Sequence, residues 1–216
     1  MEYYSQVGQD RYLNEKIFKG KEPGYFVDIG ANNGITFSNS YFFEKRLNWK
    51  GICIEPLPEI YQQLKINRQC ICIEGAIAQE QGEREFLCLQ GPDMLSGLVD
   101  EFDPRHVERI YGELQACGGS YEVIHVKTYP LQFLLELHGV THIDLCSVDT
   151  EGSEFSVLKS IDFSKVKIEC IVVENNYQTT TIEEYLLELG YQLVQKLGMD
   201  DVFLHSESCF LGHQKV

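Results

Sequence analysis

Apolar positions in this chain gather in short runs, and amphipathic segments separate the runs. Five of the runs are apolar enough on both faces to predict buried strands. They lie at 25–29, 51–56, 70–78, 142–149 and 167–176. Strands that are buried on both faces are typical of parallel sheets, because helices cover both sides of such sheets.

The segments between these runs predict helices. Pro58 and Pro130 stand where two of them begin, and Gly139 follows the end of the second. Thr181 and Glu184 have the spacing of a capping box for a later helix. The predicted helices span 35–47, 58–68, 130–138, 153–161 and 182–189. Strands that alternate with helices predict an α/β fold with a doubly wound, mostly parallel sheet.

Two further segments depart from this alternation. The stretch 91–120 is polar, bounded by glycines and helical around 104–116, and it follows a peripheral strand at 83–90. We interpret 91–120 as a lid or insertion that shapes a specific pocket. At the other end, "YQLVQK" and "VFLHS" flank "LGMDD" and predict a closing antiparallel hairpin. Without a linker or an internal repeat, residues 1–216 are expected to form a single domain.

Composition and charge narrow the class of ligand. The chain has 216 residues, 44% of them hydrophobic, which suits one domain with a large core. Its formal net charge of −15 disfavours nucleic acid and anionic membrane surfaces as partners, since both attract Lys- and Arg-rich faces. A neutral small molecule, or one delivered with a metal ion, suits this charge better as a ligand. The sequence does not specify an oligomeric state.

The cysteines and the first residues bear on location. Five of the eight cysteines lie within apolar strand-like runs, and none forms a Cys-x-x-Cys pair with zinc spacing. Buried reduced thiols are typical of cytoplasmic proteins. The opening segment "MEYYSQVGQDRYLNEK" is polar throughout, and no window is apolar enough for a spanning helix. The sequence predicts a cytoplasmic protein without membrane insertion.

The segment "YFVDIGANNG" predicts a ligand-binding turn. Asp28, Gly30, Asn32 and Gly34 follow one another at the end of the first buried strand. Glycines there let a ligand approach the free backbone N–H groups. The G-x-G-x-x-G spacing of dinucleotide sites is missing, and the carboxylate of Asp28 suits a ligand with an ammonium group, such as S-adenosylmethionine. Glu55, 21 residues after Gly34, is placed to bind ribose hydroxyls.

These motifs carry a resemblance to a known family. The segments "FVDIGANNG", "ICIEP", "SVDTEGSEFSVLKSID" and "VVENN", with "SQVGQD" and a late "GY", resemble the FkbM-type S-adenosylmethionine-dependent methyltransferases. The resemblance runs over nearly the whole chain. It implies a class I methyltransferase (Rossmann-like) fold and S-adenosylmethionine as the cofactor. It also implies O-methylation of a hydroxyl on a sugar or sugar-like natural product.

Candidate chemistry follows two other strands. An alcohol is a poor nucleophile and needs a general base or a metal ion that lowers its pKa. Asp149 ends the strand 142–149, and Glu174 with Asn175 ends the next one. Their oxygens suit Mg²⁺, Mn²⁺ or Ca²⁺, and the set is similar to that of metal-dependent class I O-methyltransferases. The alternative is that these groups only bond the substrate and each other.

Several other side chains are candidates for the site. Glu151 either orients the substrate or places a negative charge at the start of the next helix, for which Ser153 is the expected N-cap. A catalytic base is expected at His106, with His125 as the second choice, because a near-neutral pKa suits that role. Contacts with the cofactor are expected from Ser96 and from Gln9 with Asp10, although an ordinary turn and helix capping are the alternatives.

Three other functions remain open on sequence alone. The first is an NAD-dependent oxidoreductase, which the missing glycine spacing disfavours. The second is a methyltransferase-like domain that binds a ligand without turnover. The third keeps S-adenosylmethionine but moves the methyl group to nitrogen or to protein.

Overall fold

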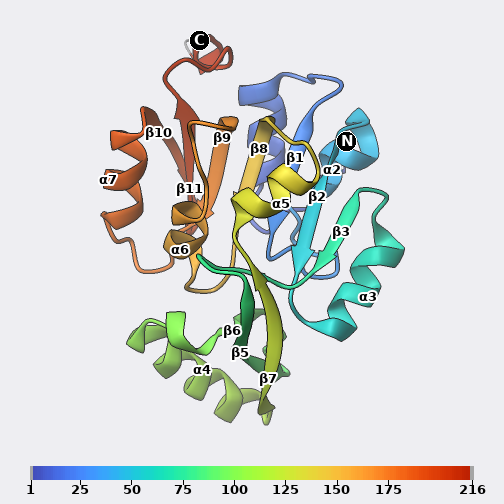
Figure 1. Ribbon diagram of the computed structural model, residues 1–216, viewed down its shortest axis with the longest axis vertical. Coiled ribbons are helices and arrows are strands. Elements are labelled where there is room, and N and C mark those ends of the chain that lie inside the picture. Colours follow the sequence, from blue (N-terminus) through green and yellow to red (C-terminus); the bar gives the residue numbers. More distant parts are fainter. Residues whose placement is uncertain (1, 215–216) are drawn as a thin grey trace.

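A computed structural model describes residues 2–214 of the chain. A seven-stranded sheet forms its centre (Figure 1). In spatial order its strands are β10 (Tyr191–Leu197), β11 (Asp200–His205), β9 (Lys167–Glu174), β8 (His142–Val148), β1 (Tyr25–Ile29), β2 (Lys50–Glu55) and β3 (Ile71–Glu74). Neighbours from β9 to β3 are parallel, while β11 runs antiparallel to both β9 and β10. The predicted sheet and its closing hairpin are both confirmed.

Helices cover both faces of this sheet because each central strand is apolar on both sides. In β1, Val27 packs into the core on one face and Phe26 into the core on the other. The first face carries α5 (Leu131–Leu137), α6 (Glu154–Lys159) and α7 (Thr181–Glu188). The second face carries α1 (Gln9–Tyr12) with a π-helical continuation at Leu13–Phe18, α2 (Tyr41–Leu47) and α3 (Pro58–Asn67). The sheet is therefore doubly wound.

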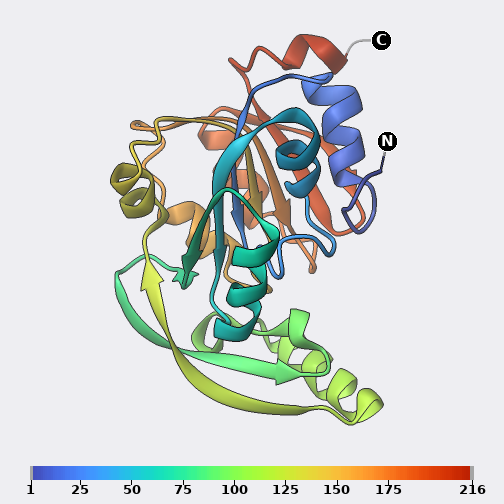
Figure 2. The ribbon, with the colours of Figure 1, turned by 90° about the vertical axis from the view of Figure 1, so that its right-hand side faces the viewer.

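A second sheet extends from one end of the main one. Its strand order is β4 (Ala76–Ile77), β7 (Ser120–Tyr129), β5 (Gly82–Gln90) and β6 (Gly97–Leu98). The long antiparallel pair β5–β7 curves away from the main sheet, and α4 (Pro104–Cys117) packs beside it (Figure 2). Short 3₁₀ turns at Asp93–Leu95 and Val99–Glu101 complete this part of the chain, which we call the outer unit (residues 76–129).

The outer unit corrects two expectations. The predicted strand 70–78 is two strands, because Gly75 turns the chain with a φ of 149° and β4 then pairs with β7 instead of β2. A Cβ at Gly75 would lie 2.8 Å from the ring of Tyr129, so the two sheets meet closely at this residue. The segment 91–120 is one part of the outer unit, which also contains the predicted peripheral strand as β5.

Two predicted helix starts are wrong. The helix expected over 35–47 begins only at Tyr41. Before it, Asn33 Oδ1 accepts the N–H groups of Ile35 and Thr36, and Ser38 Oγ accepts that of Ser40. Such side-chain bonds to the backbone compete with the helical ladder.

The predicted capping box does not form either. Thr180 occupies the N-cap of α7, without a side-chain cap bond. Ser153 does occupy the N-cap of α6, again without one. Glu154 Oε1 instead accepts the N–H groups of Thr150 and Gly152 just before that helix, at 3.0 and 2.9 Å.

All eight cysteines lie in the described part of the chain, and all are free thiols. Cys53, Cys146 and Cys170 are buried in the main sheet, while Cys70 and Cys72 are half-buried. Among residues 2–214, helices are too short or too polar to cross a membrane.

Candidate functional site

A cavity of about 670 Å³ opens at the carboxyl ends of β1, β2, β8 and β9. The strand order reverses between β1 and β8, and in doubly wound sheets ligands bind outside the strand ends at such a switch point. The outer unit supplies part of the wall through Leu95, Ser96, Leu98 and Arg109. The cavity thus lies between the main sheet and the outer unit.

The glycine turn after β1 forms one wall of this cavity. Gly30 has a φ of 79°, and a Cβ there would lie 1.7 Å from the carbonyl oxygen of Asp149. Only glycine fits this position, because both the backbone conformation and the close approach exclude a side chain. Asn32, also with a positive φ of 48°, donates its N–H to Glu55 Oε2 at 3.0 Å. The two predicted cofactor residues Asn32 and Glu55 are thus bonded to each other and line the cavity.

Gly34 stands behind the turn and does not line the cavity. Its φ is 82°, and a Cβ there would lie 2.6 Å from Leu64 and 2.7 Å from Arg68. Its backbone therefore packs against the end of α3. The sequence analysis correctly identified Gly34 as a residue with a special backbone conformation. It contacts Leu64 and Arg68, however, and not the cavity where the cofactor was expected.

Asp28 reaches the cavity from the end of β1 and is 4% exposed. Its carboxylate accepts hydrogen bonds from the hydroxyl of Ser40 and, at 3.4 Å, from that of Ser38. Burial raises the pKa of Asp28, and the positive charge of Arg68 opposes that effect. The carboxylate is therefore fixed in position at the cavity wall.

Three carboxylates at the ends of β8 and β9 also line the cavity. One oxygen from each of Asp149, Glu151 and Glu174 lies within 4.8 Å of the other two. Asp149 lies deep in the molecule but keeps access to solvent, because its carboxylate opens into the cavity. Burial and the neighbouring negative charges raise the pKa of all three groups, that of Glu174 to about 11 and that of Glu151 to about 7. We call this set the acidic cluster.

The acidic cluster has a definite polar environment around Glu151. Its backbone has a positive φ of 55°, and its Oε2 lies 3.4 Å from Arg109 Nη1 and 3.3 Å from Asn176 Nδ2. His106 Nδ1 lies 3.6 Å from the same oxygen. The cluster therefore has both cationic and neutral donors on one side and the open cavity on the other.

His106 does not line the cavity but lies behind it, beside Glu151 and Leu95. The imidazole is fully buried and stacks on Phe102, and Nε2 lies 3.0 Å from the carbonyl oxygen of Leu95. A carbonyl only accepts, so we assign the Nε2 proton to this bond. Burial lowers the pKa of His106. The expected base thus does not line the cavity, and His125 is exposed on β7, also away from it.

Asn175 is not part of the acidic cluster, in contrast to the expectation from sequence. Its Nδ2 donates to the carbonyl of Thr179 and to Asp201 Oδ2, and its Oδ1 accepts the N–H of Thr179. Side chains alternate along an extended chain, so Glu174 faces the cavity while the next residue points away. Glu151 takes the third place that Asn175 was expected to fill.

The N-terminal segment closes another side of the cavity. Gln9 lines it and donates Nε2 to Asp200 Oδ2 at 2.5 Å, which links this segment to the start of β11. Asp10 does not line the cavity and instead accepts hydrogen bonds from the N–H of Tyr4 and the hydroxyl of Ser5, without capping the helix. Ser96 lines the cavity from the outer unit, and its Oγ accepts the N–H of Leu89.

Sequence reasoning missed several lining residues. They are Phe37, Arg109, Asn176, Tyr177 and Asp200. Asp200 was assigned to a hairpin turn, and the others lie in segments whose path the apolar pattern does not determine. Of these residues, only Asp200 carries a signal in the sequence, because "GMDD" places two carboxylates side by side.

Comparison with known proteins identifies the family. Residues 28–193 match the model of the family described as "Methyltransferase FkbM domain". This match confirms the resemblance carried by the sequence motifs. No curated protein matches the sequence.

Three solved structures are similar in fold. The methyltransferase FkbM from Methylobacillus flagellatus KT has a TM-score of 0.50 at 12% identity, over 86% of this chain and 44% of that chain. This chain thus spans less than half the length of that protein. TrmK from M. capricolum, in complex with S-adenosyl-homocysteine, has a TM-score of 0.47 at 8% identity, over 95% and 70%. Precorrin-6y C5,15-methyltransferase from Geobacter metallireducens GS-15 has 0.46 at 13%, over 90% and 85%. The predicted Rossmann-like class I methyltransferase fold is confirmed.

Proposed function

The chain belongs to the FkbM methyltransferase family, and we therefore propose that it transfers the methyl group of S-adenosylmethionine to a hydroxyl of a sugar or sugar-like acceptor. One observation carries the proposal. The glycine turn with Asp28 and Glu55 shares a single cavity with the acidic cluster. A cavity of about 670 Å³ is large enough for a nucleoside cofactor beside a small acceptor.

The cofactor would lie along the wall formed by β1 and β2. Asp28 is placed to pair with the ammonium group of the methionine part, because its carboxylate already has fixed geometry. Gly30 and Asn32 allow close approach of the ligand to the turn. Glu55, at the end of β2, is placed for the ribose hydroxyls.

The acceptor would lie between the cofactor and the acidic cluster, with the outer unit as its lid. Methyl transfer requires that the acceptor hydroxyl lose a proton while it attacks the methyl group in line. Glu151 suits the general base, since its pKa of about 7 lets it hold or release a proton near neutral pH. Arg109 and Asn176 beside it keep its carboxylate in place.

The acidic cluster also fits a divalent cation. Asp149, Glu151 and Glu174 present hard oxygen donors within 4.8 Å of one another, the chemistry that Mg²⁺ and Mn²⁺ prefer. Within the described residues, Glu174 Oε2 is buried and has no hydrogen-bond partner, so it is an oxygen that a cation would satisfy. A cation held by these residues would lower the pKa of an acceptor hydroxyl bound to it.

Calorimetric titration tests the cofactor assignment. We expect micromolar binding of S-adenosylhomocysteine and no binding of NAD. Asp28→Asn and Glu55→Gln are each expected to weaken binding about tenfold or more, because each removes a charge-assisted hydrogen bond. Glu74→Gln is the matched control, since Glu74 ends the adjacent strand in register with Glu55 and does not line the cavity. Unchanged affinity in both cavity variants would disprove the assignment.

A turnover assay with labelled cofactor then tests the acceptor and the cation. We expect methyl incorporation into a sugar hydroxyl, a loss in EDTA and a recovery with Mg²⁺ or Mn²⁺. Full turnover in EDTA would remove the metal from the proposal and leave Glu151 as the base. Incorporation at nitrogen alone would refute O-methylation.

A further inference from the structure

Residues at the end of α3 form hydrogen bonds with the side of the glycine turn that faces away from the cavity. Asn67 donates its side-chain N–H to the carbonyl of Asn33 at 2.8 Å. Arg68 follows, with its side chain completely shielded from solvent. Its Nη1 donates to the carbonyl of Gly34 at 3.1 Å. The turn therefore faces the cavity with one side and α3 with the other.

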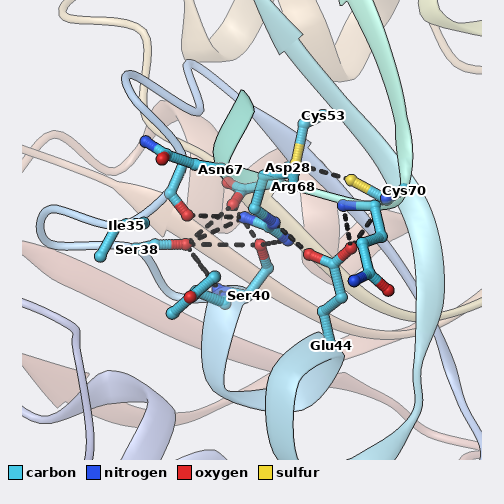
Figure 3. Close-up of polar contacts among 12 residues, drawn as sticks. Asp28, Ile35, Ser38, Ser40, Glu44, Cys53, Asn67, Arg68 and Cys70 are labelled. Atoms are coloured by element: carbon cyan, nitrogen blue, oxygen red, sulfur yellow. Dashed lines mark hydrogen bonds and ion pairs between the residues drawn. The ribbon is translucent and has the colours of Figure 1, made fainter. Parts of the chain in front are cut away.

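Arg68 also reaches Asp28 through two serines (Figure 3). Its Nη2 donates to Ser40 Oγ at 2.9 Å, and Ser40 in turn donates its only hydroxyl hydrogen to Asp28. Ser38 Oγ lies 3.4 Å from both Arg68 Nη1 and Asp28 Oδ2. Because the guanidinium occupies the acceptor side of the Ser40 hydroxyl, it directs that hydrogen toward the carboxylate. The cation thus sets the orientation of Asp28 without touching the cavity.

The guanidinium is itself fixed by other parts of the fold. Its Nε forms an ion pair with Glu44 of α2 (Figure 3). Glu44 also accepts the N–H groups of Gln69 and Cys70, so the carboxylate is held from three directions. The guanidinium lies 5.1 Å from the ring of Phe26 and 5.6 Å from that of Tyr41. With its donors directed by these contacts, Arg68 has little freedom to move.

We propose that Arg68 is a positioning residue for the cofactor: through Ser40 and Gly34 it fixes the Asp28 carboxylate and the glycine turn in the arrangement that binds the amino-acid end of S-adenosylmethionine. The inference rests on the proposed function. It means that Arg68, which lies outside the cavity, controls the affinity for the amino-acid end of the ligand. A buried ion pair contributes little stability by itself, so stability alone does not account for this arrangement.

The charge of Arg68 has a second consequence. Asp28 faces Arg68 after α3, Cys146 on β8 and Asp149 after β8, in addition to the hydroxyls of Ser38 and Ser40. Burial favours the neutral acid of Asp28, and the charge of Arg68 opposes this effect. Without the guanidinium, the pKa of Asp28 rises further, so the ionised form that pairs with an ammonium group exists only at higher pH.

Two ligands that share an adenosine part separate this role from a structural one. S-adenosylhomocysteine carries the amino-acid end, and 5′-methylthioadenosine lacks it. For Arg68→Met we expect about tenfold weaker binding of S-adenosylhomocysteine, the effect of losing a charge-assisted contact, and nearly unchanged binding of 5′-methylthioadenosine. The loss should shrink as the pH rises, because a larger fraction of Asp28 is then ionised. Lys21→Met is the control, since it breaks a partly buried ion pair with Asp144, and neither residue lines the cavity.

Each outcome decides the question. Wild-type affinity for S-adenosylhomocysteine in Arg68→Met, or an equal loss of both ligands, overturns the positioning role. If Arg68→Met does not fold, Arg68→Lys carries the test, because it keeps the charge but loses the fork of donors. It should then bind S-adenosylhomocysteine with intermediate affinity and 5′-methylthioadenosine normally. If wild type binds neither ligand, the proposed function fails, and this inference fails with it.

Discussion

Replacing Glu151 with glutamine is expected to stabilise the folded protein above neutral pH. Glu151 belongs to the acidic cluster, and its side chain is only 11% exposed. Burial is the main reason that its pKa rises from 4.5 to about 7, with the charge of Glu154 acting in the same direction and Arg109 opposing it. Glutamine has nearly the same shape but no charge, so it removes the cost of burying a carboxylate.

The sign and size follow from the difference between the two states. Below pH 4.5 the carboxyl is protonated both folded and unfolded, and the substitution changes little. Above that pH the unfolded chain ionises first, so the folded state loses stability until the pH passes about 7. At about 1.4 kcal/mol per pH unit, the full effect is about 3 kcal/mol. The charge of Glu151 also raises the pKa of Asp149, so its removal acts in the same direction there.

Urea denaturation in EDTA at pH 5 and pH 8 measures the effect. Glu151→Gln should exceed wild type by less than about 1 kcal/mol at pH 5 and by about 3 kcal/mol at pH 8. Glu169→Gln is the control with the opposite sign. Glu169 is buried, but hydrogen bonds from Lys167, Ser208 and His142 lower its pKa to about 2. Its charge therefore stabilises the fold above pH 4.5, and this contribution is lost only as the pH falls toward 2.

Two results would refute this reasoning. If the difference between Glu151→Gln and wild type does not change with pH, the acidic cluster is not a source of strain. If the variant is less stable than wild type at pH 8, the contacts of Glu151 with Arg109 and Asn176 outweigh its burial. Added Mg²⁺ should stabilise wild type more than the variant, because the proposed cation site keeps its full charge only in wild type.

Three further substitutions test other contacts. Gly30→Ala should lower cofactor affinity at least tenfold, which calorimetry measures. In thermal unfolding it should cost more stability than Gly139→Ala, because Gly139 has only the strain of a positive φ, about 1–2 kcal/mol. Asn175→Ala should cost about 1–3 kcal/mol in urea denaturation, because buried Asp201 and the backbone of Thr179 lose their bonds, and should leave S-adenosylhomocysteine binding unchanged. Gln9→Ala should leave the Asp200 carboxylate unpaired and increase amide hydrogen exchange around residues 5–9.

The main sheet could be predicted because its signals are local. Strands such as β8 and β9 are apolar on both faces, and this pattern occurs only where both faces are covered. Parallel strands bring their carboxyl ends to one edge, so Asp149 and Glu174 were expected to meet, and they do. The glycine turn could also be predicted from a local signal, since no residue other than glycine fits at position 30.

The remainder depends on contacts between distant segments. The apolar run 70–78 gives no sign that β4 leaves the main sheet, because pairing with β7 is decided 50 residues later. The choice of Glu151 over Asn175 depends on the direction of side chains after the strand ends. Arg68 was not singled out, because a lone arginine at the end of a helix is ordinary until its partners are known.

Unfavourable backbone conformations and charge repulsion are concentrated at the cavity. Six described residues other than glycine have a positive φ, and three of them, Asn32, Phe37 and Glu151, line the cavity. The acidic cluster adds the repulsion of neighbouring like charges at the same place. Such unfavourable conformations and charges persist only where many surrounding contacts hold them in place, and they are enriched at ligand sites. A ligand that pairs with these groups removes part of this cost, so binding is expected to stabilise the fold at the cavity.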